Sequence, residues 1–144
     1  MKKLILASHG SLARGMKSAL NMIAGENNKV KDFNLDNYDS PDEIEKEIEE
    51  MILEDKKNEY IIITDIKGGS VCTAVSHLCR YDSVNLVTTM SLPIVLEVAL
   101  KLESEEKAID LLNRIVPSAL GNCEILNRSI IYKLISERKE DLIW

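Results

Sequence analysis

The residues of this sequence that could do chemistry lie where two apolar runs end. His9 follows residues 4–8, and Asp65 follows residues 60–64. A carboxylate that accepts a hydrogen bond from one imidazole nitrogen leaves the other nitrogen a lone pair with which to attack. Ser70, which comes after two glycines, adds a hydroxyl and nearby backbone N–H groups that can hold an anion such as phosphate. Together these parts indicate a histidine that accepts and holds a phosphoryl group.

Each of these residues also has a purely structural interpretation. A single histidine after a strand is more often structural than reactive, Asp65 could cap a helix, and residues 68–70 could form a plain turn. Gly10 permits a sharp turn after the first strand and lets a ligand approach the backbone. Because these features converge on one sheet edge, we favour a functional site. We interpret His77, which lies in a helical segment, as an ordinary helix residue.

Other chemistries lack their sequence patterns. The sequence has no GxxxxGK[ST] phosphate-binding loop and no GxSxG serine elbow. Its two histidines are far apart, and Cys72, Cys79 and Cys123 show no CxxC spacing, so a zinc site is not indicated. We therefore expect neither a metal nor a cofactor. We expect the cysteines to be small buried side chains of a protein in a reducing compartment.

Strands and helices alternate along the chain. The first apolar run has the composition of a central parallel strand that is covered on both faces. Ser40, Pro41 and Glu43 form a capping-box pattern, which marks the start of the second helix. We predict strands over residues 4–8, 30–35, 60–65 and 84–89, and helices over residues 11–24, 41–54, 71–80, 91–102 and 104–116. This order predicts the α/β class, with a doubly wound, mainly parallel four-stranded sheet and flanking helices.

This topology would bring the candidate residues together. If the first and third strands are neighbours with their helices on opposite faces, the crevice between them is the switch point where open α/β sheets bind ligands. His9 and Asp65 would then face each other across that crevice.

The end of the chain departs from the alternating order. Residues 123–127 have the pattern of a short late edge strand, which could pair with the sheet of its own chain or with that of a second subunit. Residues 129–139 have a helical pattern, and we treat 129–144 as a C-terminal helical extension without an assigned function.

Length and charge limit the remaining possibilities. The 144 residues, of which 45% are hydrophobic, suffice for one compact core, so we expect a single domain over residues 1–144. The net charge of -6 argues against a nucleic-acid or anionic-membrane partner. The apolar stretch before His9 is too short for a signal peptide or a membrane span, which predicts a cytoplasmic protein.

Four segments resemble one family, the IIA component of the mannose-type sugar phosphotransferase system (PTS) of bacteria. Residues 8–15 (SHGSLARG) are similar to the opening motif of the family, and residues 22–25 (MIAG) are similar to a segment that follows it. Residues 65–70 (DIKGGS) resemble the D-x-x-G-G-S motif, and Leu92-Pro93 resembles the third loop. The resemblance covers residues 1–127.

The resemblance implies a role for each motif residue. His9 would be phosphorylated on Nε2, and Asp65 would orient its ring. The phosphoryl group would be held by the following residues: Gly10, Gly68, Gly69 and Ser70. Phosphate would arrive from the phosphocarrier protein HPr and pass to a IIB domain, which phosphorylates sugar that enters through the membrane partners IIC and IID. Members of the family form homodimers that exchange a late strand, so residues 123–127 are the candidate for that strand.

The sequence departs from the family pattern at a few positions. Val71 replaces a usual proline, and Lys67 replaces a frequent aromatic residue, which changes the surface that partners meet. Thr89 and Ser91 replace the common glycine and asparagine of the third loop.

Three alternatives to sugar uptake stay open. The first is a regulatory phosphoacceptor that signals rather than feeds a transporter. The second is the phosphocarrier subunit of dihydroxyacetone kinase, although no HPr-like domain follows before Trp144. The third is a non-catalytic module that binds an anion with the glycine-rich turn. The transported sugar is not encoded here, because selectivity in this family belongs to the membrane subunits.

Overall fold

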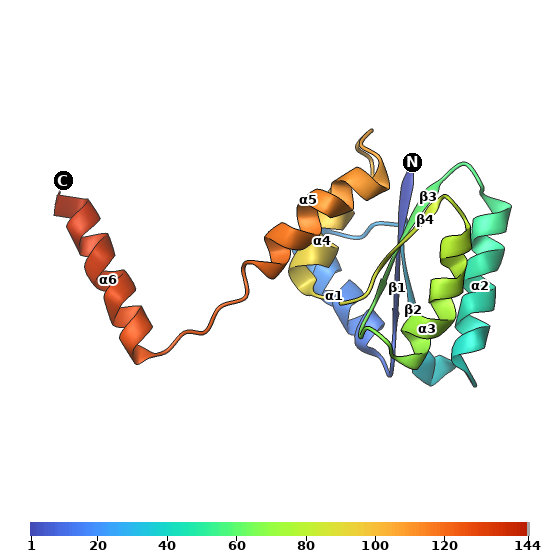
Figure 1. Ribbon diagram of the computed structural model, residues 1–144, viewed down its shortest axis with the longest axis horizontal. Coiled ribbons are helices and arrows are strands. Elements are labelled where there is room, and N and C mark those ends of the chain that lie inside the picture. Colours follow the sequence, from blue (N-terminus) through green and yellow to red (C-terminus); the bar gives the residue numbers. More distant parts are fainter. Residues whose placement is uncertain (144) are drawn as a thin grey trace.

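One parallel sheet between two layers of helices forms the body of the molecule (Figure 1). The computed structural model describes residues 1–143. The strands follow the order β2-β1-β3-β4, and all three neighbouring pairs are parallel. Their bounds are β1 (Lys2–Ser8), β2 (Val30–Asn34), β3 (Glu59–Thr64) and β4 (Val84–Val87). The predicted doubly wound four-stranded sheet is confirmed.

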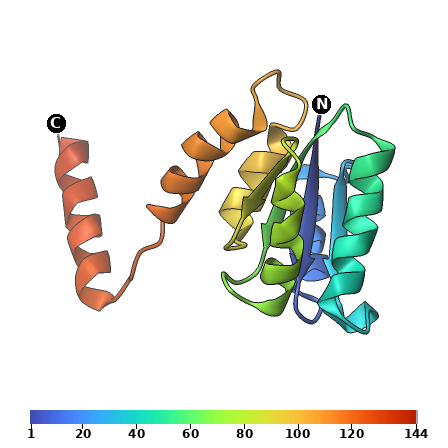
Figure 2. The same cartoon turned by 45° about the vertical axis from the view of Figure 1, so that its right-hand side comes forward.

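The helices cover both faces of this sheet. Helices α1, α4 and α5 lie on one face, and α2 and α3 lie on the other (Figures 1 and 2). The helices are α1 (Leu12–Ala24), α2 (Pro41–Glu54), α3 (Ser70–Ser76), α4 (Leu92–Leu100), α5 (Ala108–Leu120) and α6 (Arg128–Ile143). Two 3-10 turns, η1 (Leu35–Asn37) and η2 (His77–Arg80), complete the order. Within residues 1–143 no helix has both the length and the apolar character needed to cross a bilayer.

The strand β1 is apolar throughout because each of its faces meets a separate core. Leu4 and Leu6 pack into the core beneath α1, α4 and α5, whereas Ile5 and Ala7 pack into the core beneath α2 and α3. All four side chains are fully buried. Burial on both faces removes the polar positions that a half-exposed strand would carry. The core therefore holds β1 rigidly at the centre of the sheet.

The strand order creates a switch point at the carboxyl end of β1. The chain leaves β1 through α1 toward β2 on one side, and it leaves β3 through α3 toward β4 on the other side. Because β1 and β3 are neighbours and α1 and α3 lie on opposite faces, the loops after these two strands meet at one edge. This arrangement confirms the predicted neighbour relation of the first and third strands.

The opposite end of the sheet anchors the loop between α4 and α5. The ammonium group of the buried Lys2 donates hydrogen bonds to the backbone oxygens of Ser104 (2.5 Å) and Glu106 (2.7 Å). The Glu59 carboxylate accepts a hydrogen bond from the N–H of Ala108 at 3.2 Å. The helix predicted from Ser104 therefore begins only at Ala108, because contacts from two distant strands hold the preceding residues in turns.

The end of one further helix and the cap of another also differ from the prediction. The helix predicted over residues 71–80 ends at Ser76 and continues as the 3-10 turn η2. Helix α2 starts at Pro41 as predicted, but the side chain of Ser40 makes no capping bond. Instead, the Glu43 carboxylate accepts a hydrogen bond from the N–H of Asp39 at 3.0 Å. In the predicted capping box the Glu43 carboxylate would accept from the N–H of Ser40. In the structure it accepts from the N–H one residue earlier.

The expected burial of the cysteines is only partly correct. Cys72 lies in the core, whereas Cys79 and Cys123 are exposed. Cys79 lies in the 3-10 turn η2, and Cys123 follows α5, outside the two cores. The side chain of Cys79 is exposed although the preceding Leu78 of the same turn is buried in the core, and Cys123 lies in the exposed segment after α5.

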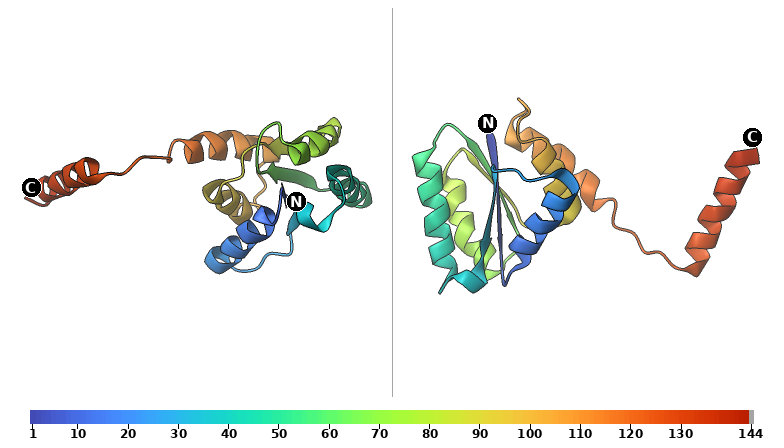
Figure 3. Two further views of the ribbon diagram at one scale, coloured as in Figure 1. Left: turned by 90° about the horizontal axis from the view of Figure 1, so that it is seen from below. Right: turned by 180° about the vertical axis from the view of Figure 1, so that it is seen from behind.

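The C-terminal part of the chain stands away from the body. Residues 123–127, predicted as an edge strand, are exposed and form no strand within the part of the chain that the structure describes. A strand needs a neighbour for its backbone hydrogen bonds, and the extended segment leads away from the sheet in both views of Figure 3. The predicted last helix is confirmed as α6, while Trp144 lies outside the described residues.

The start of α1 is capped by side chains from two strands. The buried hydroxyl of Ser8 accepts a hydrogen bond from the N–H of Ala13 at 2.7 Å. The Asn34 side-chain oxygen accepts one from the N–H of Arg14 at 2.9 Å. Ser11 occupies the N-cap position but makes no side-chain capping bond. These contacts satisfy two N–H groups that a helix leaves without internal partners, and they fix α1 to β1 and β2.

We expect Ser8→Ala to lower the free energy of unfolding by about 1–3 kcal/mol, because the buried N–H of Ala13 loses its acceptor. Urea unfolding measures this change. Ser11→Ala is the matched control and should change stability by less than about 0.5 kcal/mol. Equal effects of the two substitutions would contradict the assignment of Ser8 as the helix cap.

Candidate functional site

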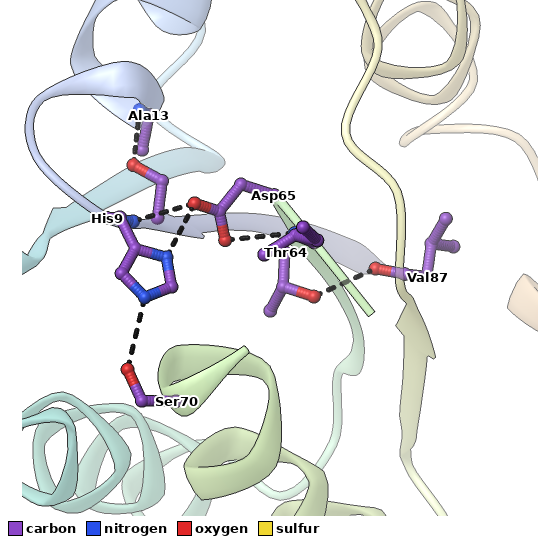
Figure 4. A network of polar contacts seen from close by, with 8 residues as sticks. His9, Ala13, Thr64, Asp65, Ser70 and Val87 are labelled. Carbon is purple, nitrogen blue, oxygen red and sulfur yellow. Dashed lines mark hydrogen bonds and ion pairs between the residues drawn. The ribbon is translucent and has the colours of Figure 1, made fainter. Parts of the chain in front are cut away.

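His9 and Asp65 meet at the switch point, directly after β1 and β3 (Figure 4). The distance between His9 Nδ1 and Asp65 Oδ2 is 2.9 Å. The same oxygen accepts a hydrogen bond from the backbone N–H of His9, also at 2.9 Å. The other carboxylate oxygen accepts from the N–H of Ile66 at 3.1 Å. Asp65 therefore fixes both the backbone and the ring of His9.

This arrangement determines which ring nitrogen is reactive. An ionised carboxylate only accepts hydrogen bonds, so the proton of the neutral ring lies on Nδ1 and the lone pair lies on Nε2. The Ser70 hydroxyl lies 3.1 Å from Nε2 and donates to that lone pair. The side chain of His9 is 43% exposed, whereas that of Asp65 is 10% exposed. A buried carboxylate thus presents a nucleophilic nitrogen at an open rim.

The charge of Asp65 is stabilised by its hydrogen bonds. Burial alone would raise the pKa of this carboxyl group. The backbone N–H and the ring of His9 both donate to it and outweigh burial, so the pKa of Asp65 lies below its ordinary value of 3.8. The carboxylate is therefore ionised at neutral pH, as an acceptor for Nδ1–H requires.

The glycine-rich loop closes against the His9 ring. A Cβ atom added at Gly69 would lie 3.0 Å from His9 Cε1 and 2.7 Å from Ile66 Cγ2. Gly68 has a φ of 77° and Gly10 a φ of 51°, conformations that L side chains rarely adopt. A side chain at Gly69 would displace the ring, while glycines at the other two positions let the loops turn at this edge.

The structure thus brings together most of the predicted site residues. Asp65, Gly69 and Ser70 each lie against the His9 ring, and Gly10 and Gly68 shape the adjoining turns. His77 lies in η2, where its Nδ1 is 3.5 Å from a Glu45 carboxylate oxygen on α2, and is not part of the site.

Sequence reasoning missed the supporting roles of Ser8 and Asn34. Both are polar and almost fully buried at the carboxyl ends of strands. Their hydrogen bonds hold the start of α1, which directly follows His9 and Gly10. The available signal for Ser8 was a polar residue at the end of an otherwise apolar run, since such a residue needs a partner when buried. The strand before Asn34 contains Lys31 and Asp32 and gave no such signal.

His9 and Asp65 are the side chains of this site whose types could ligate a metal. Within residues 1–143 no group of three or more His, Cys, Asp or Glu side chains is placed to hold one. At the site, Nδ1 contacts Asp65 and Nε2 faces the Ser70 hydroxyl.

Comparison with known proteins identifies the class to which this fold and site belong. Residues 3–116 match the family described as "PTS system fructose IIA component". The chain belongs to this family of IIA components. It is therefore a phosphotransfer component of a sugar phosphotransferase system. No curated protein matches the chain.

Solved structures share the fold. The phosphotransferase system component EIIA from Streptococcus agalactiae is 24% identical, with a TM-score of 0.76 over 90% of this chain and 98% of the other. The mannose/sorbose specific IIA subunit from Enterococcus faecalis is 24% identical, with a TM-score of 0.67 over 88% and 98%. A sigma-54 interaction domain protein from Enterococcus faecalis is 19% identical, with a TM-score of 0.68 over 83% and 90%.

We expect the stabilising effect of Asp65 to depend on pH. A group whose pKa is lowered on folding stabilises the protein fully above its unfolded pKa, and this contribution is lost as the pH falls through the folded pKa. The wild-type protein should therefore be more stable than Asp65→Asn at neutral pH, and the difference should shrink below pH 3.8. Urea unfolding across this range measures the difference.

The exposed Asp82→Asn variant controls for the loss of one negative charge. A stability difference between wild type and Asp65→Asn that stays constant as the pH falls would contradict the assignment.

Proposed function

We propose that the protein carries a phosphoryl group on Nε2 of His9 during sugar uptake in the cytoplasm. It would accept this group from phosphorylated HPr and pass it to a IIB domain, which acts with the membrane partners IIC and IID. The observation that carries the proposal is the Asp65 carboxylate 2.9 Å from Nδ1, because this contact leaves the lone pair on the exposed Nε2.

The transfer step follows from this geometry. Nε2 attacks the phosphorus atom of the donor phosphohistidine, a new P–N bond forms, and the P–N bond of the donor breaks. The phosphorylated ring keeps its proton on Nδ1 and gains positive charge, which the Asp65 carboxylate stabilises. The Ser70 hydroxyl turns from Nε2 to the phosphoryl oxygens, where the N–H groups of Gly10 and Gly68 would provide further donors. The N–H of Gly69 donates to the Ile66 carbonyl oxygen at 3.2 Å, so Gly69 would contribute by leaving room beside the ring. Attack by an acceptor nucleophile on the IIB domain reverses the sequence.

The surface around His9 is suited to a protein partner. Leu12 and Ile66, which follow the two strands of the site, expose large apolar side chains to solvent, 49% and 58% respectively. A partner that docks over the reactive ring could bury both side chains during transfer. An open rim of this kind supports transfer between proteins rather than binding of a small substrate.

A regulatory role is the second candidate. The similarity of the fold to a sigma-54 interaction domain protein favours it, because the same phosphoacceptor could signal rather than supply a transporter. Neighbouring genes distinguish the two roles. Genes for IIB, IIC and IID support sugar uptake, a transcription regulator supports signalling, and a dihydroxyacetone kinase gene supports the carrier subunit of that kinase.

We also propose that residues 123–127 pair with the sheet of a second copy. The outer edge of β4 has no neighbouring strand among the described residues, and a groove of about 320 Å³ lies between β4 and α5. Ile109, Leu112 and Val116 of α5 line its apolar side. Ile125 and Leu126 of the extended segment are exposed. Pairing would satisfy the free edge of β4 and bury these side chains.

We expect incubation with phosphoenolpyruvate, enzyme I and HPr to add one acid-labile phosphate to the protein, detected by mass spectrometry. His9→Ala should remove this label, because it removes the acceptor nitrogen. His77→Ala is the matched control and should be labelled like wild type, since His77 lies outside the site. Addition of the IIB domain should discharge the label. An unlabelled wild type, or a labelled His9→Ala protein, would disprove the proposed acceptor.

We expect the full chain to sediment as a dimer and a chain truncated after Asn122 to sediment as a monomer. The truncated chain lacks the segment that would cover the edge of β4, whereas a control truncated after Asn127 keeps it. Analytical ultracentrifugation of the three proteins separates the effect of the extended segment from that of α6. A dimer of the shortest chain would refute the exchange.

A further inference from the structure

Ser70, His9 and Asp65 are arranged like an activated serine nucleophile with its base (Figure 4). Ser70 Oγ lies 3.1 Å from His9 Nε2, and Nδ1 of the same ring lies 2.9 Å from Asp65 Oδ2. Nucleophile, general base and orienting carboxylate at hydrogen-bond distances are the features that identify such a triad, whatever the order of the residues in the chain.

The local environment of each group suits this role. Asp65 is largely buried and ionised, so it holds the tautomer in which Nε2 can accept a proton. Ser70 is exposed at the first residue of α3, directly after Gly69, and an incoming electrophile can reach its oxygen. The lack of a Cβ at Gly69 lets the ring remain next to the loop that presents the hydroxyl. Base and nucleophile are therefore aligned before any substrate binds.

We propose that Ser70 is a covalent modification site that reacts with activated acyl esters and phosphonyl fluorides. The assignment does not depend on the phosphoryl-carrier function. It concerns a different atom, Ser70 Oγ, and it uses the Nε2 lone pair as a base rather than as the nucleophile.

The reaction balances without a further reagent. As Ser70 Oγ attacks the electrophilic carbon or phosphorus atom, its proton passes to His9 Nε2, and the bond to the leaving group breaks. The leaving alkoxide or fluoride takes the proton from Nε2, which restores the neutral ring. The acyl ester on Ser70 is then hydrolysed: water attacks the carbonyl carbon and gives a proton to Nε2, the bond to Ser70 Oγ breaks, and Oγ takes that proton back. The phosphonyl adduct contains no such labile ester carbonyl and persists.

The two uses of Nε2 exclude each other. A phosphoryl group on Nε2 occupies the lone pair that would accept the proton of Ser70. An adduct on Ser70 Oγ, only 3.1 Å from Nε2, fills the space that the phosphoryl group needs. Modification of Ser70 would therefore block the carrier site without altering the histidine.

A fluorophosphonate probe tests the proposal. We expect the full-length protein to gain one adduct, which peptide mapping by mass spectrometry assigns to Ser70. The labelling rate should fall about 100-fold in His9→Ala, which removes the general base. It should fall to zero in Ser70→Ala. Asp65→Asn, which keeps the shape of the side chain but favours the wrong tautomer, should also label more slowly.

Ser11→Ala is the matched control, because Ser11 is an exposed serine in the neighbouring loop, and its labelling rate should equal that of wild type. Three results would overturn the proposal. They are the absence of an adduct, an adduct on His9 itself, and labelling of Ser70 at the same rate in wild type and His9→Ala. Phosphorylation of His9 is measured separately, with HPr.

Discussion

The contact between Asp65 and His9 is the interaction on which the site depends. One carboxylate oxygen accepts from both the backbone N–H and the ring of His9, each at 2.9 Å. The backbone contact fixes the position of the residue, and the ring contact fixes its tautomer. Every chemical property discussed for Nε2 follows from this pair of bonds, because a ring free to rotate would present its two nitrogens to solvent without distinction.

The fold serves this contact by making two strand ends rigid and adjacent. The strands β1 and β3 lie at the centre of the sheet, each buried on both faces. The reactive loops are short extensions of these strands, and Ser8 and Asn34 fix the helix that follows His9. Neither loop needs a bound ligand to hold the hydrogen bonds between His9, Asp65 and Ser70. The candidate site is thus preformed at this edge of the sheet.

The sequence predicts the strands from local patterns, and it predicts the contact of His9 with Asp65 on the condition that the first and third strands are neighbours. Apolar runs set the strands, and the alternation with helices sets the parallel order. The start of α5 at Ala108 depends on Lys2 and Glu59, which are far away in the chain, so no local pattern could place it. The direct contact of Ser70 with Nε2 was likewise not predicted, because it depends on the shape of the loop that precedes α3.

The contacts of the buried Lys2 stabilise the fold at the end of the sheet that lies opposite to the reactive residues. Its ammonium group, together with Glu59, secures the end of the sheet opposite to His9. Met1 also belongs to this end, since its backbone oxygen accepts a hydrogen bond from the N–H of Glu59 at 2.9 Å. A fusion tag joined before Met1 would therefore lie next to these hydrogen bonds. If it disturbed them, it would lower the stability of the fold before it changed the reactivity of His9. Engineering for robustness and engineering for altered chemistry can accordingly proceed at opposite ends of the same strands.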